Sequence, residues 1–331
     1  MTTERDRILP PSLALWSPVV AAILYPWGLR AFHAAVAPGG GGTVVAVVWL
    51  AVAFALPLSC LALALPGGAS SEAPARRLAF AGLTAPPLFV LVGVLAGLLH
   101  SPVEDIWIWP MLWIALGTAA SFGKASEPAP ETQPMTRLRI AHGVSAVLIL
   151  LFVAFHLFNH LTGLIGPDVH ARVMKFGRVV YRSRVIEPVL VILLLFQVSG
   201  GVQLAWRWSA RPLDLAKAIQ VGSGAYLAAF ILTHMNSAFV SARAVHKIQT
   251  DWAWATGAPE GLLASAWNIR LVPHYALGAF FVVVHLVCGL RQVLLAHGVR
   301  RELADRAWGA GLAGAAALSA AITAGLCGVR I

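Results

Sequence analysis

The sequence has few charged side chains and few cysteines, and each shortage excludes a class of protein. Charged residues make up 11% of the 331 residues, and only 14 are acidic, whereas soluble globular domains carry about 25% charged residues. An ordinary water-soluble domain is therefore excluded. Cys60, Cys288 and Cys327 lie far apart and form no CxxC or CxxCH pattern, which excludes a resident iron–sulfur cluster and a covalently attached haem. The chain also has no βαβ dinucleotide-binding fingerprint.

Long apolar runs make up most of the chain. Hydrophobic residues account for 59% of the sequence and the mean hydropathy is +0.78, which is typical of an integral membrane protein. The runs are about 20 residues long and are broken by Gly, Pro and charged clusters, so they predict helices rather than barrel strands. We predict an all-α integral membrane protein with nine transmembrane helices, at approximately 12–36, 44–65, 79–100, 106–122, 138–161, 186–206, 217–242, 271–296 and 308–328.

The basic residues predict the orientation of the chain. The formal net charge is +10, but in so apolar a chain the Lys and Arg of short loops set topology and do not indicate a nucleic-acid partner. They are in excess on the N-terminal side of the first four predicted helices. This bias predicts a multi-pass inner-membrane protein with a cytoplasmic N-terminus and its C-terminus outside. The polar start, which contains Arg5 and Arg7, does not fit a cleavable signal peptide.

One polar stretch divides the predicted helices into two groups. The segment 123–137, GKASEPAPETQPMTR, is rich in Pro, Glu and Thr and predicts a cytoplasmic linker. It separates a four-helix N-terminal extension of unassigned role, residues 1–122, from a C-terminal five-helix bundle, residues 138–331. Polar side chains inside the predicted spans are concentrated in the five-helix bundle. Because such residues are costly in a membrane, each one is a functional candidate.

Two histidines of the bundle are predicted to face each other. His156 lies about 18 residues into one helix and His234 about 17 residues into another of the same direction, so a rise of about 1.5 Å per residue brings them to nearly the same depth. Two neutral imidazoles at one depth suit the axial positions of a b-type haem. His156 and His160 also form an HxxxH pair on one helical face, and a mononuclear metal site is the alternative there.

The residues from about 136 to 297 resemble the cytochrome b membrane-anchor subunit of succinate:quinone and quinol:fumarate oxidoreductases (succinate dehydrogenase and fumarate reductase). Three stretches carry the resemblance: RIAHGVSA…AFHLFNH, QVGSGAYLAAFILTHMNSAF and VVHLVCGLR. They correspond to the family's Arg-x-x-His-Ser/Arg-x-x-Gly start with a haem-binding His-Leu, its Gln-Arg-x-Ser-Gly…Phe-x-x-x-His helix, and its His-x-x-x-Gly-Leu helix. The first pattern is altered in this chain, which has Gly143 and Ala146 at its Ser/Arg and Gly positions. The matching positions are Arg139, His142, Ser145, His156, Leu157, Gln220, Ser223, Gly224, Phe230, His234, His285 and Gly289.

The resemblance implies specific cofactor contacts. It implies one haem b held by His156 and His234 and leaves open a second haem, or a quinone site, at His285. The family has a histidine where this chain has Gln197, so His285 lacks its family partner. The resemblance also implies a quinone or haem-propionate role for Arg139, His142 and Ser145, and a propionate role for Arg182 and Arg184 in the basic segment 166–188.

The resemblance further implies a function. The five-helix bundle would anchor a complex and pass electrons between a membrane quinone and a cytoplasmic partner made of flavoprotein and iron–sulfur subunits. The chain itself would not carry out the dicarboxylate chemistry. Two alternatives remain: a transporter or proton-relay protein that uses the intramembrane histidines, and a stand-alone membrane haem protein without a soluble partner.

Overall fold

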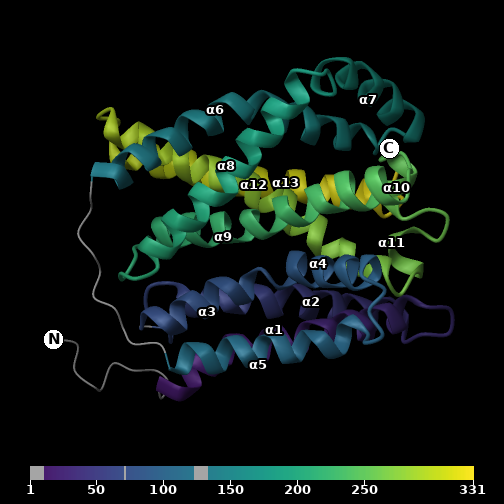
Figure 1. The fold of residues 1–331 in the computed structure, drawn as a ribbon, viewed down its shortest axis with the longest axis horizontal. Coiled ribbons are helices and arrows are strands. Elements are labelled where there is room, and N and C mark those ends of the chain that lie inside the picture. The colour runs from purple at the N-terminus through teal and green to yellow at the C-terminus, as the bar shows by residue number, and fades with distance from the viewer. Residues whose placement is uncertain (1–10, 71, 123–132) are drawn as a thin grey trace. The chain divides into compact units, whose positions relative to one another are not determined.

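The computed structural model describes residues 11–70, 72–122 and 133–331, and every regular element in this part of the chain is helical (Figure 1). The chain divides into two compact units. Unit 1 comprises residues up to 130 together with 205–226, and unit 2 comprises 131–204 together with 227–331. Helices α8 and α9 each begin in one unit and end in the other.

Unit 1 is built on five helices around an aromatic core. Tyr25, Trp109 and Trp113 are completely buried, and Phe89 packs edge-on against Tyr25 and Trp109. Trp109 Nε1 donates a hydrogen bond to the carbonyl oxygen of Ala22, at 2.7 Å. The helices are α1 (Pro11–Val36), α2 (Gly42–Ala64), α3 (Ala73–Leu83), α4 (Ala85–Leu98) and α5 (Asp105–Ser121).

Unit 2 contains the long helices in which the intramembrane histidines lie. Helix α12 packs along α13, and α6 contacts both α7 and α13 (Figure 1). Its elements are α6 (Gln133–Thr162), α7 (Pro167–Tyr181), α8 (Ile186–Trp208), α9 (Leu215–Met235), the π-helix η2 (Asn236–Val245), α10 (Trp252–Thr256), α11 (Gly261–Ala264), the 3₁₀ turn η3 (Asn268–Arg270), α12 (Leu271–Ala296) and α13 (Arg301–Leu326).

The prediction of a multi-pass helical membrane protein is confirmed. Seven helical segments of the described chain are long and apolar enough to cross a membrane, and up to eight if one bent pair forms a span. Long apolar side chains cover the outer face of these helices; Leu151 is 82% exposed and Val147 69%. An apolar surface of this kind is stable in lipid and not in water.

Two of the nine predicted spans differ from the prediction. The segment predicted at 79–100 is split into α3 and α4, which meet at Thr84 with a bend of 65°. Pro86 and Pro87 cause the break, because proline lacks the amide hydrogen that a continuous helix needs. The segment predicted at 106–122 forms α5, which has 17 residues; at about 1.5 Å per residue it is short for a full crossing.

The predicted linker at 123–137 lies largely outside the described residues, and α6 already begins at Gln133. The compact units also group the chain differently from the predicted division. Residues 205–226, the end of α8 and the start of α9, belong with the N-terminal helices. Here Arg76 Nε donates to the carbonyl of Ser209, and the Arg77 guanidinium lies 3.7 Å above the Trp206 ring. Contacts made by these two arginines therefore join the N-terminal helices to the 205–226 segment.

Candidate functional site

The rings of His156 and His234 face each other in unit 2. His156 lies on α6 and His234 on the last turn of α9, and the ring centroids are 5.9 Å apart with the planes at 70°. A metal ion bonded at about 2 Å to one nitrogen of each imidazole holds the centroids roughly 6 Å apart. The observed spacing therefore fits two axial ligands of one iron.

Phenylalanine rings stack on both imidazoles. Phe152 lies 5.7 Å from His156 on the same face of α6, and Phe230 lies 5.7 Å from His234 with the planes only 10° apart. Each phenylalanine precedes its histidine by four residues, one turn of an α-helix. Phe230 also contacts His274 of α12, at 4.6 Å. These stacked rings limit rotation of the imidazoles.

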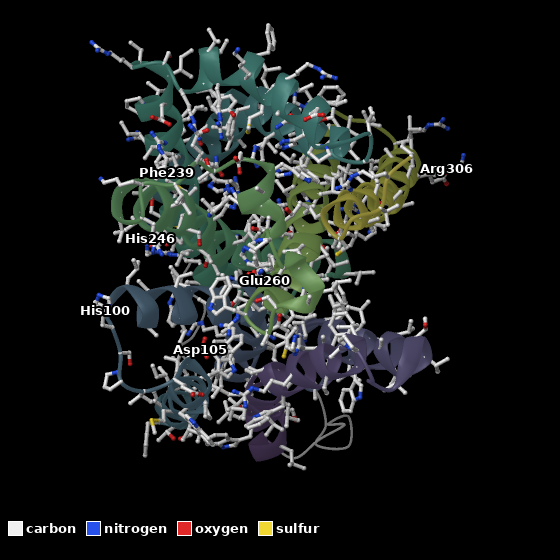
Figure 2. All side chains as sticks on the ribbon, turned by 90° about the vertical axis from the view of Figure 1, so that its right-hand side faces the viewer. His100, Asp105, Phe239, His246, Glu260 and Arg306 are labelled. Atoms are coloured by element: carbon white, nitrogen blue, oxygen red, sulfur yellow. The ribbon has the colours of Figure 1, made fainter. Side chains whose placement is uncertain are left out.

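The helix that carries His234 changes geometry directly after it. The α-helical pattern ends at Met235 and continues as the π-helix η2, which reaches Val245 and is capped by His246. Phe239 and His246 mark this segment in Figure 2. The Arg243 guanidinium lies 4.8 Å above the Phe239 ring. π-Helical segments are rare and concentrate at functional sites, which agrees with the position of His234.

A second pair of histidines was not anticipated from the sequence. The rings of His142 on α6 and His285 on α12 lie 6.3 Å apart with the planes at 83°. Their spacing matches that of the first pair and meets the same requirement for two axial ligands. The ring beside His285 is thus that of His142, whereas the resemblance places the family's partner histidine at position 197.

Gln197, which stands where the resemblance expects a histidine ligand, makes hydrogen bonds to α6. Its side-chain Nε2 donates to the backbone oxygen of His142 at 2.8 Å and to Ser145 Oγ at 2.7 Å. Ser145 Oγ in turn donates to the His142 carbonyl at 3.1 Å. Gln197 and Ser145 therefore fix the α6 backbone at His142. Arg139, one turn earlier, is exposed.

Glycines leave space around the second pair. A Cβ atom at Gly201 would lie 3.4 Å from the His142 ring, and one at Gly200 would lie 3.5 Å from His142 Nδ1. That nitrogen is buried and has no hydrogen-bond partner in the described part of the chain. A Cβ at Gly289, one turn after His285, would meet no atom within 4 Å. Gly200 and Gly201 of α8 therefore lie within van der Waals range of the His142 ring, and Gly289 of α12 faces open space.

Both pairs take one histidine from α6. His142 and His156 are 14 residues apart, close to four turns at about 3.6 residues per turn, so they lie on nearly the same face and about 21 Å apart along the axis. The two pairs therefore stand one above the other along α6.

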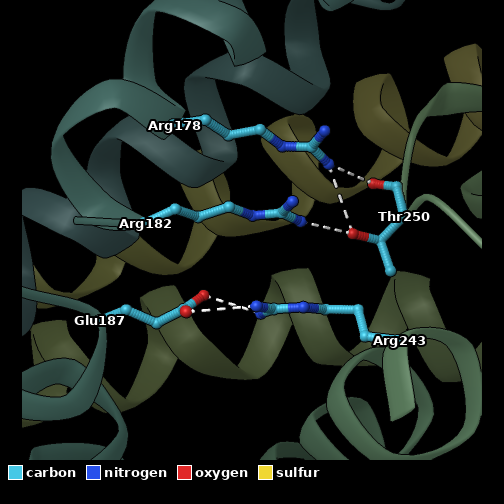
Figure 3. Close-up of polar contacts among 5 residues, drawn as sticks. All are labelled: Arg178, Arg182, Glu187, Arg243 and Thr250. Carbon is cyan, nitrogen blue, oxygen red and sulfur yellow. Dashed lines mark hydrogen bonds and ion pairs between the residues drawn. The ribbon is translucent and has the colours of Figure 1, made fainter. Parts of the chain in front are cut away.

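The two arginines predicted to contact haem propionates, Arg182 and Arg184, differ in their surroundings. Figure 3 shows Arg178 and Arg182 of the α7 region meeting at Thr250, where Arg182 Nη2 donates to the hydroxyl at 2.7 Å and Arg178 Nη2 to the carbonyl at 2.9 Å. Arg178 Nε is buried and has no hydrogen-bond partner among the described residues. Arg184 is exposed. Beside them, Arg243 forms a two-pronged ion pair with Glu187, at 2.7 and 3.2 Å.

His170 is a polar residue of this region that the sequence did not single out. It lies on α7, 2% exposed, and its ring is 5.7 Å from that of His160. Burial and the Arg178 cation lower the pKa of His170 to about 4, against a smaller opposite effect of Asp251. The signal was the spacing of His170, Met174 and Gly177, which form the buried face of an amphipathic helix.

The alternative of a mononuclear metal site at His156 and His160 finds no third protein ligand among the described residues. The rings of His156 and His160 are 4.7 Å apart, but no three His, Cys, Asp or Glu side chains of residues 11–70, 72–122 and 133–331 converge on a point where an ion could bind. A mononuclear zinc site needs at least three protein ligands. Facing imidazoles without a third ligand suit an iron whose other four ligands come from a macrocycle.

Comparison with protein-family models, with curated proteins and with solved structures found no match to this chain. The resemblance to cytochrome b anchors therefore rests on the short motifs quoted above.

Proposed function

We propose that this chain is a membrane electron-transfer protein that holds one haem b at each of its two histidine pairs. The observation that carries the proposal is the pair of ring distances, 5.9 Å for His156–His234 and 6.3 Å for His142–His285. Both lie near the roughly 6 Å that two nitrogen bonds to one metal ion require. The resemblance implies one haem at His156 and His234 and leaves a second open at His285, and the position of His142 beside His285 supports the second.

The side chains fit this cofactor. Haem supplies one-electron chemistry when bound, and its iron takes two axial ligands from the protein. One imidazole from each side would hold the iron and would leave no position for oxygen or another external ligand, which would favour electron transfer over oxygen chemistry. Metal ligation would suit neutral imidazoles inside a membrane, where polar groups are costly when left unsatisfied.

The arrangement along α6 supports transfer across the membrane. With two sites about 21 Å apart along one helix, an electron entering near one face would leave near the other. We propose that the chain lies in the inner membrane with its N-terminus in the cytoplasm, as the loop charges predict.

The partners in this proposal follow from the resemblance. The donor or acceptor on the cytoplasmic side is a flavoprotein with an iron–sulfur subunit, and the second substrate is a membrane quinone. An open apolar groove of about 320 Å³ runs along α6, α12 and α13 and suits an isoprenoid tail; it is lined by Leu150, Val153, Ala154, Leu157, Phe158, Leu161, Val283, Leu286 and Leu318.

One observation favours transport as a second candidate function. The α3–α4 pair of unit 1 is bent by 65° at Thr84, and broken helices of this kind form substrate sites in many secondary transporters. A transporter of this kind would show no haem absorbance and would function without a soluble redox partner.

The experiment is a haem count on the purified protein. A pyridine haemochrome assay and a reduced-minus-oxidised spectrum give the number of b haems per chain for the wild type and for His156→Ala, His234→Ala, His142→Ala and His285→Ala. We expect two haems in the wild type and one in each variant, with the same haem lost within each pair. His297→Ala, an exposed histidine at the end of α12, is the control and should retain both. A wild type without haem under haem-replete expression contradicts the proposal.

A further inference from the structure

A second group of polar side chains lies beside the His156–His234 pair. The His160 ring is 4.7 Å from that of His156 and 5.7 Å from that of His170. Asn159 Nδ2 lies 3.1 Å from His170 Nε2, and the two residues are 5% and 2% exposed. A row of imidazoles therefore leads from His156 on α6 to His170 on α7.

Three buried atoms in this group have no hydrogen-bond partner among the described residues: His160 Nδ1, His170 Nδ1 and Asn159 Oδ1. Buried polar atoms in native proteins are satisfied, often by an ordered water that makes about three hydrogen bonds. Because the Asn159 amide donates to Nε2 of neutral His170, the ring carries its proton on Nδ1. One donor, one acceptor and the His160 nitrogen form a suitable set of partners for bound water.

The row of imidazoles ends at a charged loop. His170 is faced by Asn159 and His160 from α6, by Arg178 from its own helix, and by Asp251 from the loop before α10. Asp251 is half-exposed and caps α10, since Oδ1 accepts from the backbone nitrogen of Trp254 at 3.0 Å. Its carboxylate is therefore a charged group near His170 that also reaches solvent.

The indole ring of Trp252 also covers His170. The Trp252 ring lies 4.6 Å from His170 and presses on Gly163, where a Cβ atom would come within 1.9 Å of the indole. The Arg330 guanidinium lies 5.5 Å from the same ring. Asp251 is thus the acidic group among those that face His170, and it is partly exposed.

We propose that His170, together with water bound beside His160 and Asn159, forms a proton relay that takes up a proton from the Asp251 loop next to the His156–His234 pair. The relay rests on the proposed function, because its task is to balance the charge of an electron held between His156 and His234. The electron comes from the iron–sulfur partner and adds one negative charge, which favours the protonated form of a nearby imidazole.

The transfer balances one proton against one electron. A proton from bulk water passes Asp251 and binds Nε2 of His170, whose neutral ring becomes an imidazolium. The Asn159 amide turns so that Oδ1 accepts from Nε2–H. On oxidation the electron leaves, the proton returns to water and the amide turns back. The low pKa of His170 keeps the ring neutral until the electron arrives.

The test uses the haem-loaded full chain in lipid nanodiscs. Midpoint potentials of both haems are titrated between about pH 5 and pH 8, and proton uptake on reduction is followed with a pH-indicator dye. Exchange of the imidazole C2 hydrogen, read by mass spectrometry, reports the protonation of His170 itself in the oxidised and reduced protein. The variants are His170→Gln and Asp251→Asn, with His297→Gln as the control.

In the wild type we expect the potential of the His156–His234 haem to fall as pH rises, with proton uptake on reduction and a higher His170 pKa in the reduced protein. His170→Gln should abolish the pH dependence and the uptake. Asp251→Asn keeps a side chain that caps helices well, so it should fold normally and slow the uptake. Two bound haems with potentials and proton uptake equal in wild type and His170→Gln overturn the relay and leave the proposed function intact. Absence of haem overturns both.

Discussion

The two units differ in the positions of their aromatic and histidine side chains. In unit 1 the aromatic rings of Tyr25, Trp109 and Trp113 are completely buried, and both histidines lie at the ends of helices, His33 in the last turn of α1 and His100 just after α4. In unit 2 histidines lie inside the long apolar helices and face one another at 5.9 and 6.3 Å. Since polar rings inside a span are costly, unit 2 is the part of the described chain in which we expect the functional site.

The largest effect should come from breaking the aromatic core of unit 1. Trp109→Ala removes a fully buried ring and its hydrogen bond to the Ala22 carbonyl, and such truncations cost about 3–5 kcal/mol. We expect a large drop in thermal stability in detergent, with the haem-to-protein ratio of the surviving folded fraction unchanged. Trp107→Ala, on the same helix and 55% exposed, should change little. Loss of haem from folded Trp109→Ala protein would contradict the expectation that the core of unit 1 affects stability but not haem binding.

A substitution that adds one methyl group in unit 2 should change the haem site, unlike the substitution in the core of unit 1. A Cβ atom at Gly278 would lie 2.3 Å from the Phe230 ring, which stacks on His234. Gly278→Ala should therefore displace Phe230 and cost about 1–3 kcal/mol through overpacking. We expect altered absorbance of the His156–His234 haem and an unchanged second haem. Gly309→Ala, where an added Cβ would meet no atom within 4 Å, is the control, and equal spectra for the two variants would contradict the packing account.

The stability of unit 2 should depend on pH through His170. Its pKa is about 4 in the folded protein against an ordinary value of 6.5, so between these values the unfolded chain binds more protons. Stability should therefore fall by about 1–3 kcal/mol as pH decreases from 6.5 to 4, because one pKa unit corresponds to about 1.4 kcal/mol. Unfolding of the haem-free protein at several pH values measures this. His170→Gln should flatten the profile and His297→Gln should not.

The smallest effects should come from the ion pairs. Arg243 and Glu187 of unit 2 make two short contacts and are 35% and 25% exposed, whereas Arg30 and Glu104 of unit 1 lie 3.9 Å apart and are 57% and 74% exposed. We expect Arg243→Gln to cost about 1 kcal/mol and Arg30→Gln at most about 0.5 kcal/mol. Denaturation at low and high salt distinguishes them, since salt screens exposed pairs more strongly. A larger loss for Arg30→Gln would reverse the comparison.

Much of the architecture is readable from the sequence, because helix length and hydropathy are local properties. Seven predicted spans correspond to continuous long helical segments. Depth counting also brought His156 and His234 to one level, and their rings lie 5.9 Å apart. Their role as haem ligands stays a prediction.

The second pair was missed because its depth depends on a helix boundary. Helix α6 begins at Gln133, nine residues before His142, and His285 lies eleven residues before α12 ends at Ala296. The predicted start at 138 concealed this match. His170 was missed for another reason: it lies in the segment between two long helices, and only tertiary packing brings α7 back against α6. Sequence periodicity gives the buried face of α7 but not the surface that it contacts.

Electron paramagnetic resonance of the oxidised protein tests the central claim most directly. The imidazole planes of the two pairs meet at 70° and 83°, and nearly perpendicular axial imidazoles give low-spin ferric haem a highly anisotropic signal with one large g value. We expect two such signals, one for each histidine pair, with one lost in His156→Ala and the other in His142→Ala. A high-spin signal from singly ligated iron, or no haem signal at all, would contradict it.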